Sequence, residues 1–181
     1  ILDKDDDLNA NSVIPYSPWL TQPHSDTPSR DTTPPTAGTV SDGTSTDISS
    51  TTTKTSLSAN WSGFSDSHSG IEDYSYSIGT TSGGTDLKTW TSNGSSTSAT
   101  VYNFNLSLTV GATYYFSVKA TDYAGNVSGV ATSNGVKLLG IIYTVKTDGT
   151  GGYTTIQAAL DGSTSGDTVL VYEGTYEECF E

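Results

Sequence analysis

Acidic side chains are the groups in this sequence whose types and spacing could do chemistry. The chain carries 20 Asp and Glu residues against 7 Lys and Arg residues, which gives a formal charge of −13. Many of the acids stand in stretches rich in Gly, Ser and Asn, which are typical of loops. Ca²⁺ takes roughly six to eight oxygen ligands from carboxylates, amides and backbone carbonyls. Calcium is therefore the one cofactor that the sequence indicates.

A run of acids near the N-terminus has the alternate-position oxygens of an EF-hand-like calcium loop. These oxygens belong to Asp3, Asp5, Asp7 and Asn9. The run departs from the EF-hand pattern, because Leu8 stands where the turn needs glycine and Ile14 where a bidentate Glu belongs. A solvated acidic linker is the alternative interpretation.

Catalytic groups are harder to find. Catalysis needs a nucleophile with a base and an orienting group, paired carboxylates, or a metal-held water, all on a rigid scaffold. Both histidines, His24 and His68, fall in polar, loop-like stretches without an identifiable partner. None of the acids stands in a motif that separates it from ordinary surface charge. We assign no catalytic residue and predict that this stretch of sequence is not an enzyme.

Aromatic side chains raise the possibility of polysaccharide binding, because sugars stack on exposed rings. Trp61 is expected in the core and Trp19 at a docking contact. Trp90 and Tyr115 are the candidates that remain for a carbohydrate surface, and packing within the protein is the alternative for both.

Charge and hydropathy exclude several classes of partner. Seven basic residues are too few to form a nucleic-acid-binding face. No apolar run is long enough to span a bilayer, so membrane insertion is not expected. Cys179 is the only cysteine and cannot form an internal disulfide. Acidity fits a secreted or cell-surface protein, and the missing initiator Met and signal sequence indicate a fragment or a processed chain.

Residues 36–138 contain short alternating segments separated by polar turns, at the spacing of a β-sandwich. Strands are expected at residues 36–41, 55–61, 73–79, 87–91, 97–103, 112–121 and 127–137. In the clearest of them, Tyr114, Phe116, Val118 and Ala120 share the face that alternation assigns to the core. Trp61 should pack against this face from the opposite sheet. The sequence predicts a mainly β protein with a seven-stranded, immunoglobulin-like sandwich.

Several motifs in this region resemble the fibronectin type III family. The proline-rich start of that family, its second-strand Trp and its Leu-turn-Gly-x-x-Tyr segment are matched by Pro34, Pro35, Trp61, Leu108, Gly111 and Tyr114. The bacterial secreted members are the most similar, with further matches at residues 31–35, 69–71 and 120–126. The resemblance covers residues 31–138, and it implies a non-catalytic module of a larger extracellular protein.

The predicted topology gathers a second set of calcium candidates. In such a sandwich the chain start and two of the loops lie at one pole. The oxygen ligands placed there are Asp31, Asp66, Glu72 or Asp73, Asp122 and Asn126. Gathered carboxylates repel one another unless a cation or N–H groups compensate them. A calcium site and a network of turn hydrogen bonds are the two interpretations.

The segments on either side of the sandwich differ from it in pattern. Residues 1–30 are acidic and proline-rich, as expected of an extended linker. Within them, residues 15–20 resemble the segment that follows the last coil of β-helix repeat proteins.

Residues 139–181 follow the sandwich with a different order of elements. Strands are expected at 142–145 and 167–172, and a short amphipathic helix at 153–160. With Gly174 and Tyr176 as a Gly-x-Tyr motif, this order resembles the cap and first coil of a pectin-lyase-like right-handed parallel β-helix.

These observations favour a structural function. The leading prediction is a non-catalytic extracellular spacer or adhesion module, whose partners are neighbouring domains of its own chain. One alternative is a filament subunit that binds copies of itself by strand addition at incomplete ends. The other is an accessory module of a polysaccharide-active enzyme whose active site lies elsewhere.

Overall fold

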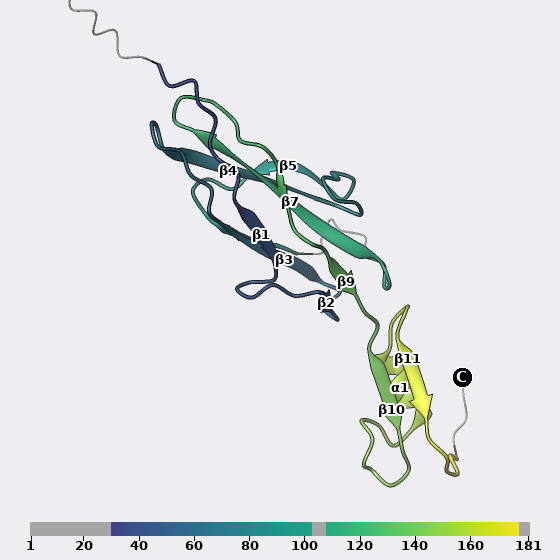
Figure 1. Cartoon of the computed structure of the whole chain (residues 1–181). Coiled ribbons are helices and arrows are strands. Elements are labelled where there is room, and N and C mark those ends of the chain that lie inside the picture. The colour runs from purple at the N-terminus through teal and green to yellow at the C-terminus, as the bar shows by residue number, and fades with distance from the viewer. Residues whose placement is uncertain (1–29, 103–107, 178–181) are drawn as a thin grey trace, which may run out of the picture. The chain divides into compact units, whose positions relative to one another are not determined.

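The computed structural model describes residues 30–102 and 108–177 (Figure 1). Its strands are β1 (Thr39–Asp42), β2 (Ser50–Thr51), β3 (Ser56–Ser62), β4 (Ile71–Gly79), β5 (Lys88–Ser92), β6 (Ser98–Tyr102), β7 (Thr113–Asp122), β8 (Ala131–Thr132), β9 (Val136–Leu138), β10 (Ile142–Val145) and β11 (Thr168–Val171). The described helix is α1 (Ile156–Gly162). The mainly β fold class predicted from the sequence is confirmed.

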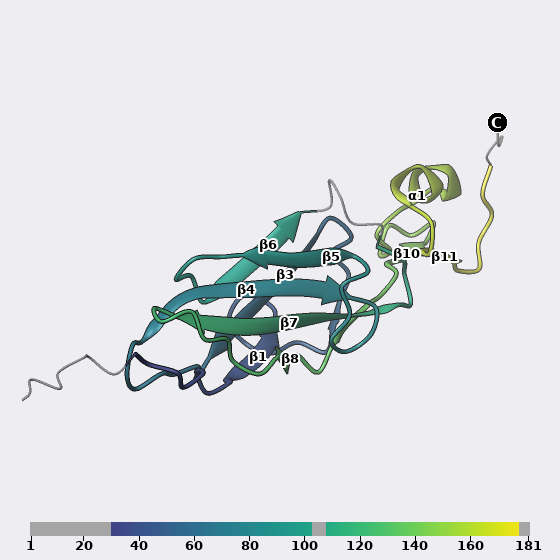
Figure 2. The ribbon, with the colours of Figure 1, turned by 90° about the horizontal axis from the view of Figure 1, so that it is seen from above.

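Residues 31–102 and 108–138 form a two-sheet, immunoglobulin-like sandwich (Figure 2). One sheet has the strand order β1-β3-β6, and the other has the order β2-β9-β7-β4-β5 with β8 also paired to β7. Neighbouring strands are antiparallel, except that β2 runs parallel to β9. This order places β4 and β7 at the centre of the larger sheet, where they make the longest ladder of the sandwich.

The core follows the alternation of side chains along β7 and β3. Tyr114, Phe116, Val118 and Ala120 of β7 are buried, as predicted. Trp61 of β3 faces them from the other sheet and packs near Tyr74 and Tyr76. The side chains of the two sheets therefore form one hydrophobic cluster between the layers.

A tyrosine near the start of β7 fixes the turn that precedes this strand. The hydroxyl of Tyr114 accepts a hydrogen bond from the amide of Thr109 at 2.6 Å and donates to the carbonyl of Thr109 at 3.3 Å. Such a tyrosine corner is a hallmark of immunoglobulin-like sandwiches. The Leu-turn-Gly-x-x-Tyr motif in the sequence therefore has a structural reason.

The single strand predicted at residues 127–137 is wrong, because this segment forms the two short strands β8 and β9. Gly135 has a φ of +95°, which interrupts an extended strand. Just before it, Ser133 turns its hydroxyl inward to accept the amide of Phe116 at 3.1 Å. The break lets the chain leave one partner strand and join another.

Residues 140–177, here called the C-terminal βαβ segment, contain the parallel pair β10 and β11 with α1 between them in the chain. The helix begins at Ile156, later than the predicted 153, because Thr155 is its N-cap and accepts the amide of Ala158. Ala159 is buried, whereas Leu160 is 44% exposed. The Tyr176 hydroxyl donates to the carbonyls of Val145 and Tyr172.

Candidate functional site

The acidic pole predicted from the topology exists in part. We use this name for Asp31, Asp66, Asp122 and Asn126. The Ser69 hydroxyl donates to both Asp31 (2.7 Å) and Asp66 (3.3 Å). The Asn126 amide donates to Asp122 at 2.8 Å and to the backbone carbonyl of Asp31 at 3.3 Å. Three loops that are distant in the sequence thus meet through their polar groups.

Backbone amides compensate the charges of the acidic pole. Asp66 accepts the amides of His68, Ser69 and Gly70, and the bond from Ser69 contributes most to lowering the pKa of Asp66. Burial alone would raise the pKa of Asp122, but hydrogen bonds from Asn126 and Ala124 outweigh burial and lower this pKa. The turns themselves therefore hold the carboxylates of Asp66 and Asp122 in their charged form.

Two predicted ligands do not join this cluster. Asp73 turns to the β5–β6 connection instead, where it accepts the Ser92 hydroxyl and the Gly94 amide at 2.9 Å. Glu72 is exposed on β4. The register of the β4–β7 ladder shifts between Ile71 and Asp73, and Glu72 has no partner in it, so the regular alternation assumed from the sequence does not hold there.

His68 is a residue that the sequence analysis did not include among the metal ligands. Its ring, Asp31 and Asp66 offer ligand atoms that all lie within 4.8 Å of one another. Its adjacency to the Asp66 turn was the signal available in the sequence. Asp3, Asp5 and Asp7 lie outside the described residues. Calcium binding stays a prediction for both places.

The two aromatic candidates for carbohydrate binding are each covered on one side. The Lys119 ammonium lies 4.6 Å from the centre of the Trp90 ring. The ring of Tyr115 packs over Gly135, where an added Cβ would lie 2.5 Å from it. Both side chains are half-buried. Polysaccharide binding at these residues stays a prediction.

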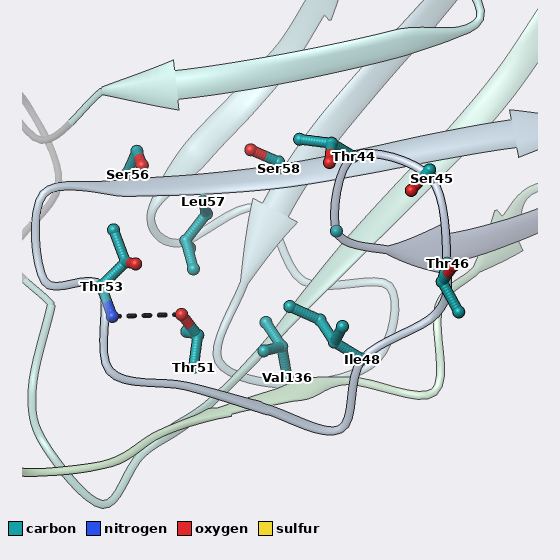
Figure 3. Close-up of a pocket in the computed structure, with 11 residues that line it drawn as sticks. Thr44, Ser45, Thr46, Ile48, Thr51, Thr53, Ser56, Leu57, Ser58 and Val136 are labelled. Carbon is teal, nitrogen blue, oxygen red and sulfur yellow. Dashed lines mark hydrogen bonds between the residues drawn. The ribbon is translucent and has the colours of Figure 1, made fainter.

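A pocket of about 280 Å³ opens beside the start of β3. Figure 3 shows Leu57, Ile48 and Val136 around it, with the loop 43–48 along one side. Ser56 and Ser58 leave β3 on the face opposite Leu57, so their hydroxyls point away from this space. The Thr51 hydroxyl accepts the Thr53 amide at 3.1 Å. None of the described side chains that line the pocket is ionisable.

Asp42, the last residue of β1, is a buried carboxyl group beside this loop. Its side chain is 0% exposed. One oxygen, Oδ2, accepts the amide of Gly135 at 2.9 Å, whereas Oδ1 has no hydrogen-bond partner among the described residues. Burial raises the pKa of Asp42 to about 6, and the nearby charge of Asp47 adds to the effect. No sequence motif marks this group, because its burial depends on loops from both sheets.

Asp167 connects the C-terminal βαβ segment to the sandwich. Its Oδ1 accepts the Lys54 ammonium at 2.6 Å and the Ile141 amide at 2.7 Å, and its Oδ2 accepts the amide and hydroxyl of Thr164. The Asp167 side chain is only 1% exposed. Lys54, followed by these other donors, holds the pKa of Asp167 well below its usual range. Nearby, Gly166 is so close to Val110 that an added Cβ would lie 2.5 Å from the valine Cβ.

The strand order and the tyrosine corner define an immunoglobulin-like β-sandwich. No family model and no curated protein matches the chain. Among solved structures, the chain is similar to the crystal structure of the chicken CNTN1 FN1-FN3 domains, with 18% sequence identity and a TM-score of 0.41. That likeness covers 63% of this chain and 40% of the other. Across the described residues, no helix is long and apolar enough to cross a membrane.

Proposed function

We propose that this chain is a non-catalytic spacer module of a larger extracellular protein, and that it holds a neighbouring β-helix domain at a fixed place. Fibronectin type III-like sandwiches commonly serve as non-catalytic modules in multidomain chains. Function must be argued from particular residues, because one fold supports many functions. The observation that carries the proposal is the ion pair between Lys54 and Asp167.

A spacer transmits position only if its connection to the next domain resists bending. Leu138 ends β9 and Ile142 begins β10, so the connection is short. Lys54, which lies 113 residues from Asp167 in the sequence, reaches across to it. Because the Asp167 carboxylate is almost fully covered, water competes poorly for this ion pair. The contact of Val110 with Gly166 adds a steric restraint.

The C-terminal βαβ segment supports a β-helix as the neighbour. Parallel sheets are usually covered on both faces, yet the described pair β10 and β11 leaves large apolar side chains exposed. Ile142 is 65% exposed, and Leu170, Val171 and Tyr172 are each more than 40% exposed. Further parallel coils stacked on this pair would bury them. The coding sequence that flanks this 181-residue chain tests the proposal. We expect β-helix repeats there, and an unrelated flanking sequence would contradict the proposal.

A Lys54→Met substitution tests the connection itself. We expect faster proteolytic cleavage at residues 139–141, because the methionine leaves Asp167 without its ion-pair partner. Lys137→Met is a matched control, since the Lys137 side chain is exposed on β9. Equal cleavage of both variants and the wild type would contradict a stiff connection.

The same exposed side chains favour one alternative, a filament subunit. In that case the strands of another copy would cover β10 and β11 by strand addition. Sedimentation velocity separates the two: a spacer stays at one sedimentation coefficient over a wide concentration range, whereas a filament subunit forms larger species. An Ile142→Lys substitution should abolish such species if β10 is the contact.

A further inference from the structure

We propose that Asp42 is a pH-sensitive latch between the two sheets, which strengthens the sandwich and the loop 43–48 as the surroundings become mildly acidic. The latch is the hydrogen bond from the Gly135 amide to Asp42 Oδ2. It joins the end of β1 in one sheet to the residue before β9 in the other.

The environment of Asp42 disfavours its charged form. The carboxyl is fully buried, and its Oδ1 has no donor to replace the water that it loses on folding. Asp47 is the charged group that acts on it among the described residues, and this charge is of the same sign. The Gly135 amide, which donates to Oδ2, and the nearby Ser133 hydroxyl both lower the pKa of Asp42, but burial outweighs them. Protonation on Oδ1 removes the uncompensated charge and leaves Oδ2 free to keep the latch.

Asp42 also closes the base of the loop 43–48. Its amide donates to Asp47 Oδ1 at 2.9 Å, and its carbonyl accepts the Ile48 amide at 3.1 Å. Asp47 is held from the other side by the Asn134 amide at 2.8 Å. A negative charge on Asp42 should therefore weaken both the loop 43–48, which lines the pocket, and the contact between the two sheets.

The sign and size of the effect follow from proton linkage. The folded protein binds the Asp42 proton more tightly than the unfolded chain, so the stabilisation is complete below the ordinary carboxyl pKa and is lost as the pH rises through about 6. Taking 3.8 and about 6 as the two pKa values, the unfolding equilibrium constant should fall about tenfold from pH 7.5 to pH 5.

Urea unfolding at pH 7.5, 6 and 5 tests the latch. We expect the unfolding equilibrium constant of the wild type to fall about tenfold from pH 7.5 to pH 5. The unfolding equilibrium constant of Asp42→Asn should not change over this range. Glu72→Gln, which removes an exposed acid on β4, is the matched control and should follow the wild type. A wild type without this change, or an Asp42→Asn variant that follows it, would overturn the proposal.

A direct titration keeps the test decisive if Asp42→Asn fails to fold. The carboxyl ¹³C resonance of Asp42 in the wild type should titrate with a midpoint near 6. A midpoint at the ordinary carboxyl value would overturn the latch. The amide of Ile48, corrected for intrinsic exchange, should be better protected at pH 5 than at pH 7.5.

Discussion

Gly166 offers the sharpest single-residue test of the contact between the sandwich and the C-terminal βαβ segment. It has a φ of +87°, and an added Cβ would lie 2.5 Å from Val110 Cβ. Gly149 is a matched control, because its φ is +77° but nothing lies within 4 Å of an added Cβ. Alanine at either position pays a similar free-energy cost for the positive φ, whereas only the alanine of Gly166→Ala clashes with Val110.

The expected magnitudes follow from these two geometries. A left-handed backbone costs an alanine about 1–2 kcal/mol, and its less flexible unfolded chain returns about 0.4–1 kcal/mol. Gly149→Ala should therefore lower the free energy of unfolding by about 0–1.6 kcal/mol. Overpacking adds about 1–3 kcal/mol for Gly166→Ala. The difference between the two variants therefore separates the cost of the steric contact from the cost of backbone strain.

Urea denaturation of both variants, followed by the fluorescence of the tyrosines and by circular dichroism, measures the difference. Val110→Ala in the Gly166→Ala background should recover only part of the loss, because it removes the two Cγ methyl groups at 2.7 and 3.0 Å but keeps the Cβ at 2.5 Å. Equal losses for the two glycine variants, with no recovery from Val110→Ala, would refute a contact between Gly166 and the sandwich.

Three further predictions concern the acidic pole and the tyrosine corner. If the acidic pole binds calcium, a chelator should lower the melting temperature and Asp66→Asn should remove that response; an unchanged melt with chelator counts against the site. The pKa of Asp66 is lowered in the folded state, so its carboxylate stabilises the fold above the ordinary carboxyl pKa, and this stabilisation is lost as the pH falls below that value. The wild type should therefore lose more of its free energy of unfolding than Asp66→Asn between about pH 5 and 3. Tyr114→Phe should lower the free energy of unfolding by about 1–3 kcal/mol, because the Thr109 amide loses its acceptor; urea unfolding measures this, and a loss below about 0.5 kcal/mol would show that water replaces the hydroxyl.

The sandwich could be predicted because its core residues repeat with the period of a strand. Tyr114, Phe116 and Val118 alternate with polar neighbours, and this alternation alone assigns a face. The segment 127–137 was mispredicted because its break depends on Gly135 and on partners in other strands. Local pattern carries no information on where a strand changes its partner.

The candidate sites were less accessible to sequence reasoning. Topology correctly placed Asp31, Asp66 and Asp122 at one pole. Asp73 instead bonds to the β5–β6 connection, next to an irregularity in the β4–β7 ladder that the sequence pattern does not show. Neither Asp42 nor the ion pair of Lys54 with Asp167 has a local motif, since both arise where segments far apart in the sequence meet. Such buried charges depend on contacts between distant segments, and local patterns in a single sequence do not predict those contacts.

Rotational diffusion tests the spacer account most directly. ¹⁵N relaxation of the backbone amides in β7 and β11 reports how each part tumbles. A stiff connection predicts one common diffusion tensor for residues 31–138 and for the C-terminal βαβ segment, and independent tumbling in Lys54→Met. Separate correlation times in the wild type would contradict the account.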